Sequence, residues 1–378
     1  PANIDDYRAL ARARLPHYLF DYIDGGSHSE SALAANTLAF GGITLRQRVM
    51  RDVSRVDTRV HLFGQELALP LLLAPVGFAG MYARRGEVQA ARAAHAAGLP
   101  FCLSSVSICD LAEVKGATGT APWFQLYMVK DRGVMQALLA QAAALACPVL
   151  LFTVDLPVPA PRYRDARSGF MAPPSARRTF KLAADTLAHP AWAWDVMLRG
   201  RPHAFGNFAR DIPEARALAD FGAWVGRNYE QRLTWDDLAW LRRHWPGPIV
   251  LKGVLDADDA EEAVRQGVDG LVVSNHGGRQ FDGAGATIAA LPRVAERVAG
   301  RVPVLLDGGV RTGLDILRAC ALGADACLVG RPWAWGLGAR GEAGVAHVLA
   351  ILAQELRTSM ALAGCTHIAA VDASVLAA

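Results

Sequence analysis

The sequence lacks a strong charge of either sign and any cysteine pattern typical of zinc sites. Of its 378 residues, 39 are basic and 36 are acidic, so the formal net charge is +3. This balance gives no overall field that would attract nucleic acid. None of the six cysteines forms a Cys-x-x-Cys pair, and most lie in apolar runs. We therefore expect buried, reduced thiols in a protein on the cytosolic side, with no disulfide and no metal site.

Long hydrophobic runs are also missing. The longest uncharged stretch, from Leu67 to Ala83, is interrupted by two prolines and two glycines, so we expect a strand and a loop there and not a membrane span. The first residues, Pro1 to Tyr7, lack the basic and apolar regions of a signal peptide. The length suits one domain over 1–378, because α/β barrels often exceed the usual domain size.

Short apolar segments alternate with helical patterns along most of the chain. Eight strands are predicted, at 70–75, 101–105, 123–127, 149–155, 248–253, 270–275, 303–308 and 326–330. The predicted helices are 86–97, 108–115, 131–145, 234–244, 256–266, 287–299, 312–322 and 341–363. The alternation of strands with helices predicts parallel strands joined by crossovers. Eight such units favour a closed (β/α)8 (TIM) barrel over an open sheet.

Two regions lie outside this barrel of about 67–363. Residues 1–66 are predicted to hold a helical piece and a hairpin around Leu62–Glu66. Residues 156–232 form a long insertion after the fourth strand, and connections of this length are usually functional or mobile.

Every predicted strand ends in polar or glycine residues. In such barrels the active site lies at the carboxyl ends of the strands. The sixth strand is followed by Ser274-Asn275-His276-Gly277-Gly278-Arg279-Gln280. An imidazole accepts a proton near neutral pH, and a guanidinium matches a carboxylate. This segment predicts proton removal from a molecule that carries a carboxylate.

The ends of the last two strands suggest a phosphate site. Asp307-Gly308-Gly309-Val310-Arg311 precedes a predicted helix, and Gly330-Arg331 follows the eighth strand. Glycine amides, a helix N-terminus and two arginines suit a phosphate at this position in a barrel. The alternative is a tight turn with two solvated arginines, but the glycine-arginine pairs on adjacent strands favour phosphate.

These residues resemble the flavin mononucleotide (FMN)-dependent 2-hydroxy acid dehydrogenases and oxidases over nearly the whole chain. The motifs are Tyr22–Gly26, Ala74–Gly77, Trp123–Tyr127, Thr153–Asp155, Lys252–Gly253, Ser274–Gln280 and Asp307–Arg311. Met81–Glu87 and Arg162–Ala166 are similar to segments of the bacterial respiratory L-lactate dehydrogenases of this family.

The resemblance implies a cofactor site for FMN. The implied contacts are Pro75, Val76, Gly77, Ser104, Gln125, Thr153, Lys252, Ser274, Asp307, Gly308, Gly309, Arg311, Gly330 and Arg331. Lys252 is expected near the flavin N1/O2 edge, where reduction builds up negative charge.

The family resemblance also implies a substrate site, formed by Tyr22, Tyr127, Arg162, His276 and Arg279. His276 is expected to be the general base, with Asp155 stabilising its imidazolium. Arg279 and Arg162 would hold the substrate carboxylate, while Tyr127 and Tyr22 would hydrogen-bond the substrate.

For three of these side chains a purely structural role is the alternative. Tyr22 would then pack at a helix end, Asp155 would cap the following loop, and Arg162 would be solvated within the insertion.

The implied reaction is oxidation of an L-2-hydroxy acid, with L-lactate as first choice. A mandelate-type dehydrogenase and an oxidase using O2 are the alternatives, although Gly77 favours a dehydrogenase, since many oxidases of the family carry alanine there. A non-redox phosphate-binding isomerase or lyase is the alternative from another class, and a catalytically silent binding protein is a third.

Aromatic and cationic residues alternate between 177 and 205, a composition suited to an anionic membrane surface. We expect a peripheral contact with the cytoplasmic side of the inner membrane and electron transfer to a quinone. The alternative is a soluble loop or subunit contact in the cytoplasm, with its tryptophans packed inward. The family also implies a homotetramer.

Overall fold

In the computed structural model, which describes residues 1–170, 175–216 and 224–377, eight parallel strands form the central sheet. Their order is β3, β10, β9, β8, β7, β6, β5 and β4, and a parallel bridge between Leu73 and Phe101 closes the ring. The strands are β3 (Leu71–Leu73), β4 (Cys102–Ser104), β5 (Trp123–Leu126), β6 (Leu150–Thr153), β7 (Ile249–Val254), β8 (Gly270–Val273), β9 (Val304–Leu306) and β10 (Ala326–Val329). Each overlaps a predicted strand, which confirms the (β/α)8 barrel.

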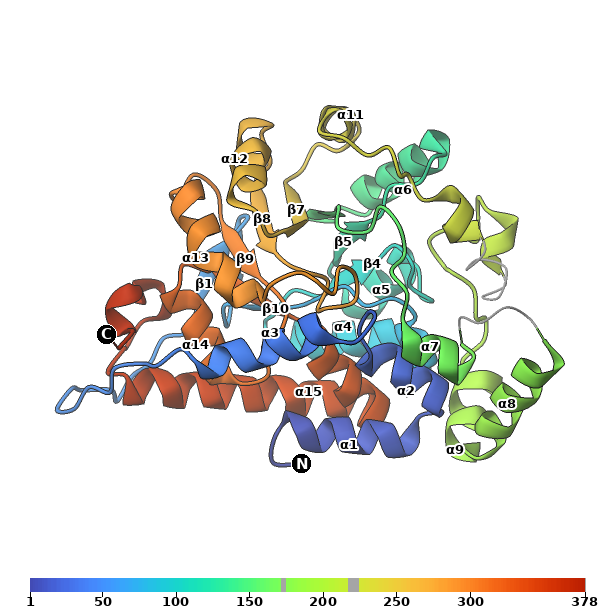
Figure 1. Ribbon diagram of the computed structural model, residues 1–378, viewed down its shortest axis with the longest axis horizontal. Helices are drawn as coiled ribbons and strands as arrows, with labels where there is room; N and C mark the ends of the chain where they lie inside the picture. The colour runs from blue at the N-terminus through green and yellow to red at the C-terminus, as the bar shows by residue number, and fades with distance from the viewer. Residues whose placement is uncertain (171–174, 217–223, 378) are drawn as a thin grey trace.

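Helices surround this barrel (Figure 1). They are α4 (Gly86–Ala96), α5 (Leu111–Thr118), α6 (Arg132–Ala144), α11 (Asp236–His244), α12 (Ala257–Arg265), α13 (Thr287–Val298), α14 (Gly313–Ala321) and α15 (Arg331–Leu362). Helix α5 begins later than predicted, because the Asp110 side chain accepts a hydrogen bond from the Glu113 N–H and caps the helix there.

The start of the last helix was predicted wrongly. Helix α15 begins at Arg331, directly after β10, and not at 341; its regular geometry is interrupted at Arg340 and Gly341. At Gly336, a Cβ would lie 2.8 Å from the Gly344 carbonyl oxygen. The glycine therefore allows the two halves of α15 to pack closely.

The N-terminal region contains α1 (Ile4–Arg14), α2 (His17–Asp24), α3 (Ser31–Gly41) and the predicted hairpin, β1 (Val60–Leu62) with β2 (Gln65–Leu67). Helix α1 runs along α15 (Figure 1). The ring of Phe63, in the hairpin turn, lies 5.5 Å from that of Trp123 at the start of β5. The hairpin thus covers the amino-terminal end of the barrel, opposite the predicted site.

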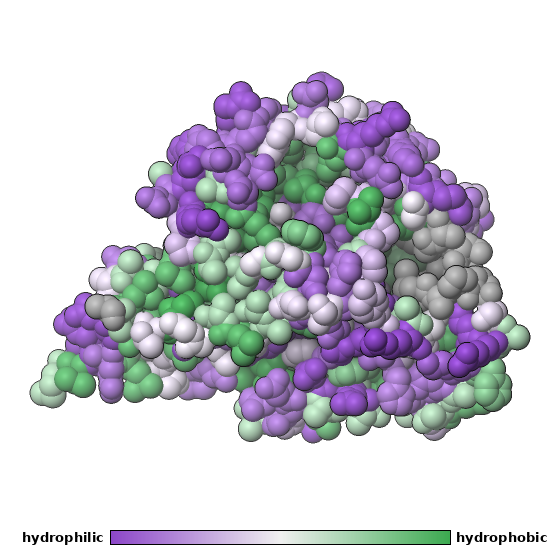
Figure 2. Space-filling view, viewed as in Figure 1, coloured by the Kyte–Doolittle hydropathy of each residue, from purple (hydrophilic) through white to green (hydrophobic). Residues whose placement is uncertain are grey.

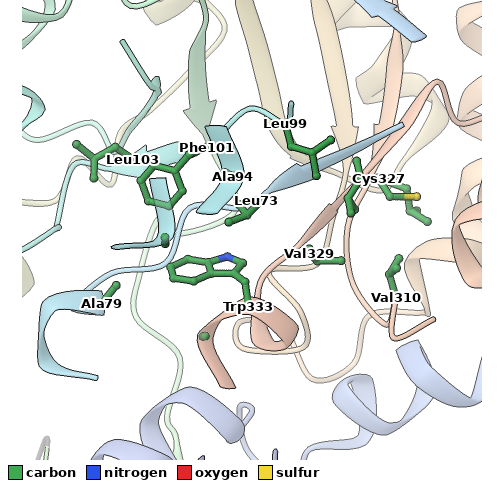
Figure 3. Packing of buried hydrophobic residues seen from close by; sticks show 14 of the residues in the cluster. Leu73, Ala79, Ala94, Leu99, Phe101, Leu103, Val310, Cys327, Val329 and Trp333 are labelled. Carbon is green, nitrogen blue, oxygen red and sulfur yellow. The ribbon is translucent and has the colours of Figure 1, made fainter. Parts of the chain in front are cut away.

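A buried tryptophan holds the chain in place where β3 leads into the predicted site. Trp333, near the start of α15, packs among apolar residues of several strands, as Figure 3 shows. Its ring lies 5.8 Å from that of Phe101, and its indole N–H donates to the Ala74 carbonyl at 3.1 Å. This contact fixes the chain just before Pro75–Gly77.

The insertion contains α7 (Tyr163–Ser168), α8 (Ala176–Leu187), α9 (Pro190–Trp192), the π-helical turn η2 (Ala193–Leu198) and the 3₁₀ turn η3 (Pro213–Arg216). Parts of the predicted insertion, 171–174 and 217–223, lie outside the described residues. Helices α8 and α9 extend from one end of the molecule next to α2 (Figure 1). Buried Trp192 anchors them by donating to the Met81 carbonyl at 2.8 Å.

Three short 3₁₀ turns complete the fold: η1 (Ala79–Met81), η4 (Ile368–Ala370) and η5 (Ala373–Val375). No helix among the described residues has the length and apolar character needed to cross a membrane. All six cysteines are free and five are buried, as expected from the sequence.

Candidate active site

A cavity opens at the carboxyl ends of the barrel strands. Most of the predicted site residues lie on its wall: Tyr22, Pro75, Val76, Gly77, Tyr127, Thr153, Arg162, Lys252, His276, Arg279, Asp307, Gly308, Gly309, Arg311, Gly330 and Arg331. They come from α2, the insertion and the ends of several strands, and the fold gathers them around one space. The rule that barrel sites lie at the strand ends therefore located the cavity correctly.

His276 stands on this wall between two hydrogen-bonding partners. Its Nδ1 lies 2.9 Å from the Asp155 carboxylate, and its Nε2 lies 3.3 Å from the Tyr127 hydroxyl. The residue adopts a left-handed backbone conformation with φ of 58°, as do the two glycines that follow. At Gly278, a Cβ would collide with the backbone of Leu33, so this tight turn requires glycine.

Burial favours the neutral form of the His276 imidazole. Burial lowers the pKa of His276, and although Asp155 acts in the opposite direction, the pKa stays below its ordinary value. Burial raises the pKa of Asp155, but the imidazole and Lys252 outweigh that effect and bring it below its usual range. A neutral imidazole beside a carboxylate is ready to accept a proton and to be stabilised afterwards.

Two guanidinium groups flank the Tyr22 ring. The Cζ atoms of Arg279 and Arg162 lie 4.9 Å and 5.5 Å from its centroid. Arg279 donates to the Tyr22 carbonyl at 2.6 Å and the Gly25 carbonyl at 2.9 Å. Burial lowers the pKa of Arg279, and the nearby cation of Arg162 lowers it further. Two partly buried cations that face one cavity would both be stabilised by a bound carboxylate.

The alternative of a solvated Arg162 is wrong, since its side chain is only 17% exposed. It lies 3.5 Å from the Asp165 carboxylate, and its buried Nε has no hydrogen-bond partner. Asp155 likewise faces His276, although the sequence also allowed a loop cap.

Lys252 provides a third cation on the wall. Its Nζ lies 3.0 Å from the Asp307 carboxylate and donates to the Ser274 hydroxyl at 2.9 Å. Burial lowers the pKa of Lys252, but Asp307 and Asp155 outweigh burial, so the pKa is raised and the ammonium is favoured. The other oxygen of Asp307, Oδ1, is buried without a partner.

Three predicted cofactor residues, Ser104, Gln125 and Ser274, are buried behind the wall and outside the cavity lining. The Ser104 hydroxyl donates to the Gln125 side-chain oxygen at 2.9 Å, and the Gln125 amide donates to the Thr153 hydroxyl at 3.0 Å. Thr153 itself lines the cavity. The three buried residues therefore orient Thr153 and Lys252.

The predicted phosphate groove is lined by Gly308, Gly309, Arg311, Gly330 and Arg331. Burial lowers the pKa of Arg311 to about 10 and that of Arg331 well below its ordinary value. Within the described part of the chain, neither guanidinium has a carboxylate at ion-pair distance. Partly buried cations without an ion-pair partner, beside glycine amides, favour a bound anion.

Several wall residues were missed by sequence reasoning. Tyr229, Val225, Gly226 and Pro159 all come from the insertion. The Tyr229 ring lies 5.4 Å from that of Tyr127, and burial raises its pKa. Its sequence neighbourhood carries no motif, so no pattern indicated its position.

Phe78 lies in the segment that contains Gly77 and forms one wall of the cavity. It has φ of 60°, and its ring lies 5.3 Å from Tyr22, 6.0 Å from Phe170 and 4.9 Å from Phe205. This aromatic cluster limits the space beside Tyr22.

Known proteins with similar sequences include FMN-dependent dehydrogenases. A family model described as FMN-dependent dehydrogenase matches residues 11–378. An L-lactate dehydrogenase from Caulobacter sp. (strain K31) is 54% identical over 100% of this chain and 98% of its own length. An L-lactate dehydrogenase from Alcaligenes faecalis is 48% identical over 98% of this chain and 97% of its own.

Solved structures give the same fold. The monotopic membrane protein (S)-mandelate dehydrogenase superposes with a TM-score of 0.92 at 34% identity, covering 100% of this chain and 99% of that one. A mandelate oxidase crystallised with (S)-4-hydroxymandelic acid has a TM-score of 0.86 at 37% identity, with coverage of 100% and 98%.

Proposed function

The chain belongs to the FMN-dependent dehydrogenase family, and we propose that it oxidises L-lactate to the 2-oxo acid and passes the electrons to a quinone. The observation that carries this proposal is the convergence of His276, Arg279 and Arg162 on one cavity. Identity of about half to L-lactate dehydrogenases over their full length favours lactate over mandelate. The balanced reaction is L-2-hydroxy acid plus quinone giving 2-oxo acid plus quinol.

The residues on the wall fit FMN. Arg311 and Arg331, together with the amides of Gly308 and Gly309, would hold its phosphate, because neither guanidinium has an ion-pair partner among the described residues and burial lowers the pKa of each. Lys252 would lie near its pyrimidine edge, and Pro75–Gly77 would offer backbone contacts. Gly77 leaves room: a Cβ there would lie 2.9 Å from a Val106 methyl carbon. When bound, FMN supplies the two-electron acceptor.

The protein groups would do the following work in this proposal. Arg279 and Arg162 hold the substrate carboxylate, so the hydroxyl-bearing carbon has one orientation. His276 takes a proton through Nε2, the nitrogen that Asp155 leaves free, and Asp155 stabilises the imidazolium. Tyr127, 3.3 Å from the same nitrogen, hydrogen-bonds the substrate oxygen.

Anaerobic mixing with 2-hydroxy acids tests the substrate. We expect L-lactate to bleach the yellow protein with a higher kcat/KM than (S)-mandelate, and D-lactate to leave it yellow. Faster bleaching by (S)-mandelate would replace the lactate assignment with the mandelate one. A colourless protein with no flavin would instead favour a non-redox barrel. Rapid hydrogen peroxide release during turnover in air, with no response to a quinone analogue, would identify an oxidase.

The proposed membrane contact involves α8 and η2. Four large apolar side chains are exposed there: Phe180 (76%), Leu187 (79%), Trp194 (61%) and Leu198 (56%). Green and purple residues mix on this part of the surface, at the lower right of Figure 2. Of the two tryptophans near 190, Trp192 packs inward and Trp194 points outward. Exposed apolar groups among arginines and lysines suit the interfacial layer of an anionic membrane.

Replacing both Phe180 and Trp194 with Ser should weaken binding to anionic liposomes by more than about tenfold, since each ring would lose about 1.5–3 kcal/mol of burial. Cosedimentation with vesicles measures this. The matched control is Leu38→Ser, on α3, where Leu38 is 75% exposed. If the unmodified protein stays in the supernatant, or the control weakens binding equally, the contact lies elsewhere or does not exist. The tetramer stays a prediction from the family.

A further inference from the structure

Two histidines and one aspartate meet where α2 contacts the insertion. His17 is the first residue of α2, Asp185 lies on α8, and His189 directly precedes α9. One ligand atom from each lies within 4.8 Å of those of the other two. Among the described residues this is the one such cluster of histidine, cysteine or carboxylate groups. It is separate from the cavity described above, whose lining contains none of the three.

The distances resemble those between ligands of one metal ion. His17 Nδ1 lies 3.0 Å and His189 Nδ1 lies 3.5 Å from Asp185 Oδ1. Ligands at about 2.1 Å from a tetrahedral zinc ion are separated by about 3.4 Å. Small side-chain rotations would therefore bring all three groups onto a common ion.

Two further polar atoms of the cluster already have hydrogen-bond partners in the protein backbone. The second oxygen of Asp185, Oδ2, accepts from the Tyr18 backbone N–H at 3.3 Å, which leaves Oδ1 available. His189 Nδ1 also lies 2.8 Å from the Asp185 carbonyl. Because this hydrogen bond occupies Nδ1, His189 would ligate through Nε2 once its ring turns toward Asp185 Oδ1, and the 3.5 Å from Nδ1 shows that the ring is close to that oxygen.

We propose that His17, Asp185 and His189 bind one divalent transition-metal ion of the zinc class that clamps α2 to the insertion. Two imidazoles and one carboxylate suit Zn²⁺. His17 is 69% exposed, so an ion has access and water can complete the coordination, while Asp185 (14%) and His189 (12%) are largely buried.

The clamp would act on the wall of the substrate site. Tyr18, next to His17, stacks on Phe170 with 5.7 Å between centroids, and Phe170 lies 5.2 Å from the Tyr22 ring. The ion would thus hold α8, the proposed membrane segment, against the helix that carries Tyr22. Because it binds the folded chain, it should raise thermal stability.

Calorimetric titration of the EDTA-treated, dialysed holoenzyme with Zn²⁺ tests the site. We expect one ion per chain with micromolar affinity and a rise of several degrees in the thermal midpoint. His17→Ala and Asp185→Asn should each weaken zinc binding by more than about tenfold. Even mutation of a residue that only hydrogen-bonds a metal ligand lowers metal affinity about 10- to 100-fold. Neither residue lines the active-site cavity, so activity without zinc should stay unchanged.

The matched control is His61→Ala. His61 is an exposed histidine 3.4 Å from the Glu66 carboxylate but, among the described residues, it belongs to no cluster with a second histidine. This variant should bind zinc like the unmodified protein. The proposal is overturned if the unmodified chain binds no zinc, if the His17 and Asp185 variants keep full affinity, or if His61→Ala loses it. Failure of the lactate assay would leave these readings unaffected.

Discussion

Replacing His276 with Asn is expected to lower the rate of anaerobic flavin reduction by L-lactate by about 100- to 10,000-fold, the usual contribution of a general base. Asn suits this test because residue 276 has φ of 58°, a conformation that Asn adopts more readily than most side chains. The turn should therefore stay intact while the proton acceptor is lost. Stopped-flow absorbance gives the rate, and the flavin spectrum gives the FMN content.

The pH profile separates loss of a base from loss of structure. A neutral imidazole is required, so kcat/KM of the unmodified enzyme should fall as pH drops through the pKa of His276. Burial lowers that pKa, so the fall should occur below the ordinary range for histidine. Asp155→Asn removes a charge that raises this pKa, and its fall should shift to still lower pH. A His276→Asn variant that keeps the same fall, or retains most of the rate, would exclude His276 as the base.

The barrel explains why His276 and Asp155, a pair that the family resemblance implied, lie close together. Asp155 follows β6 and His276 follows β8, so β7 lies between them, yet parallel strands of a closed barrel end at the same rim. Gly253 near the end of β7 leaves the space open: a Cβ there would lie 2.6 Å from the Asp155 Cβ. The strand-end rule therefore accounts for both residues lying at one rim, and the glycine explains how the geometry permits their contact.

The limits of sequence reasoning are clearest at Arg331. The glycine-arginine motif predicted a phosphate ligand, but the guanidinium also donates to the backbone carbonyls of Asp24, Gly25 and Gly277. Arg331 therefore joins α2 to the turn after His276 as well as lining the groove. Sequence spacing cannot reveal such contacts, because they depend on loops that come together only in the folded chain.

The insertion shows a second limit. Tyr229 and Phe170 lie beside the site, but each belongs to a segment without the regular period of a strand or helix packed on the barrel. Their positions depend on how the insertion folds back, which a hydrophobic pattern does not encode.

Replacing Arg279 with Lys should reduce kcat/KM for L-lactate by about 30-fold to several thousand-fold, which corresponds to the cost of about 2–5 kcal/mol for disrupting a buried charge pair. Lysine keeps the charge but loses the planar fork that matches a carboxylate. It can still donate to the Tyr22 or Gly25 carbonyl, so the end of α2 should hold its position. Steady-state kinetics with a quinone analogue give the ratio. Arg8→Lys is the matched control, because Arg8 pairs with Asp24 outside the cavity and should leave kcat/KM nearly unchanged.

An uncharged substrate analogue distinguishes carboxylate binding from a structural role of Arg279. Lactamide has the hydroxyl and the methyl group of lactate but no carboxylate, so the unmodified enzyme should turn it over poorly. If Arg279 holds the carboxylate, the lysine variant should lose activity toward lactate while its activity toward lactamide changes little, because the missing interaction is already absent. Equal losses on both substrates would mean that Arg279 acts through the positions of Tyr22 and Gly25. The carboxylate clamp would then rest on Arg162, whose unpartnered buried Nε is the remaining donor beside the Tyr22 ring.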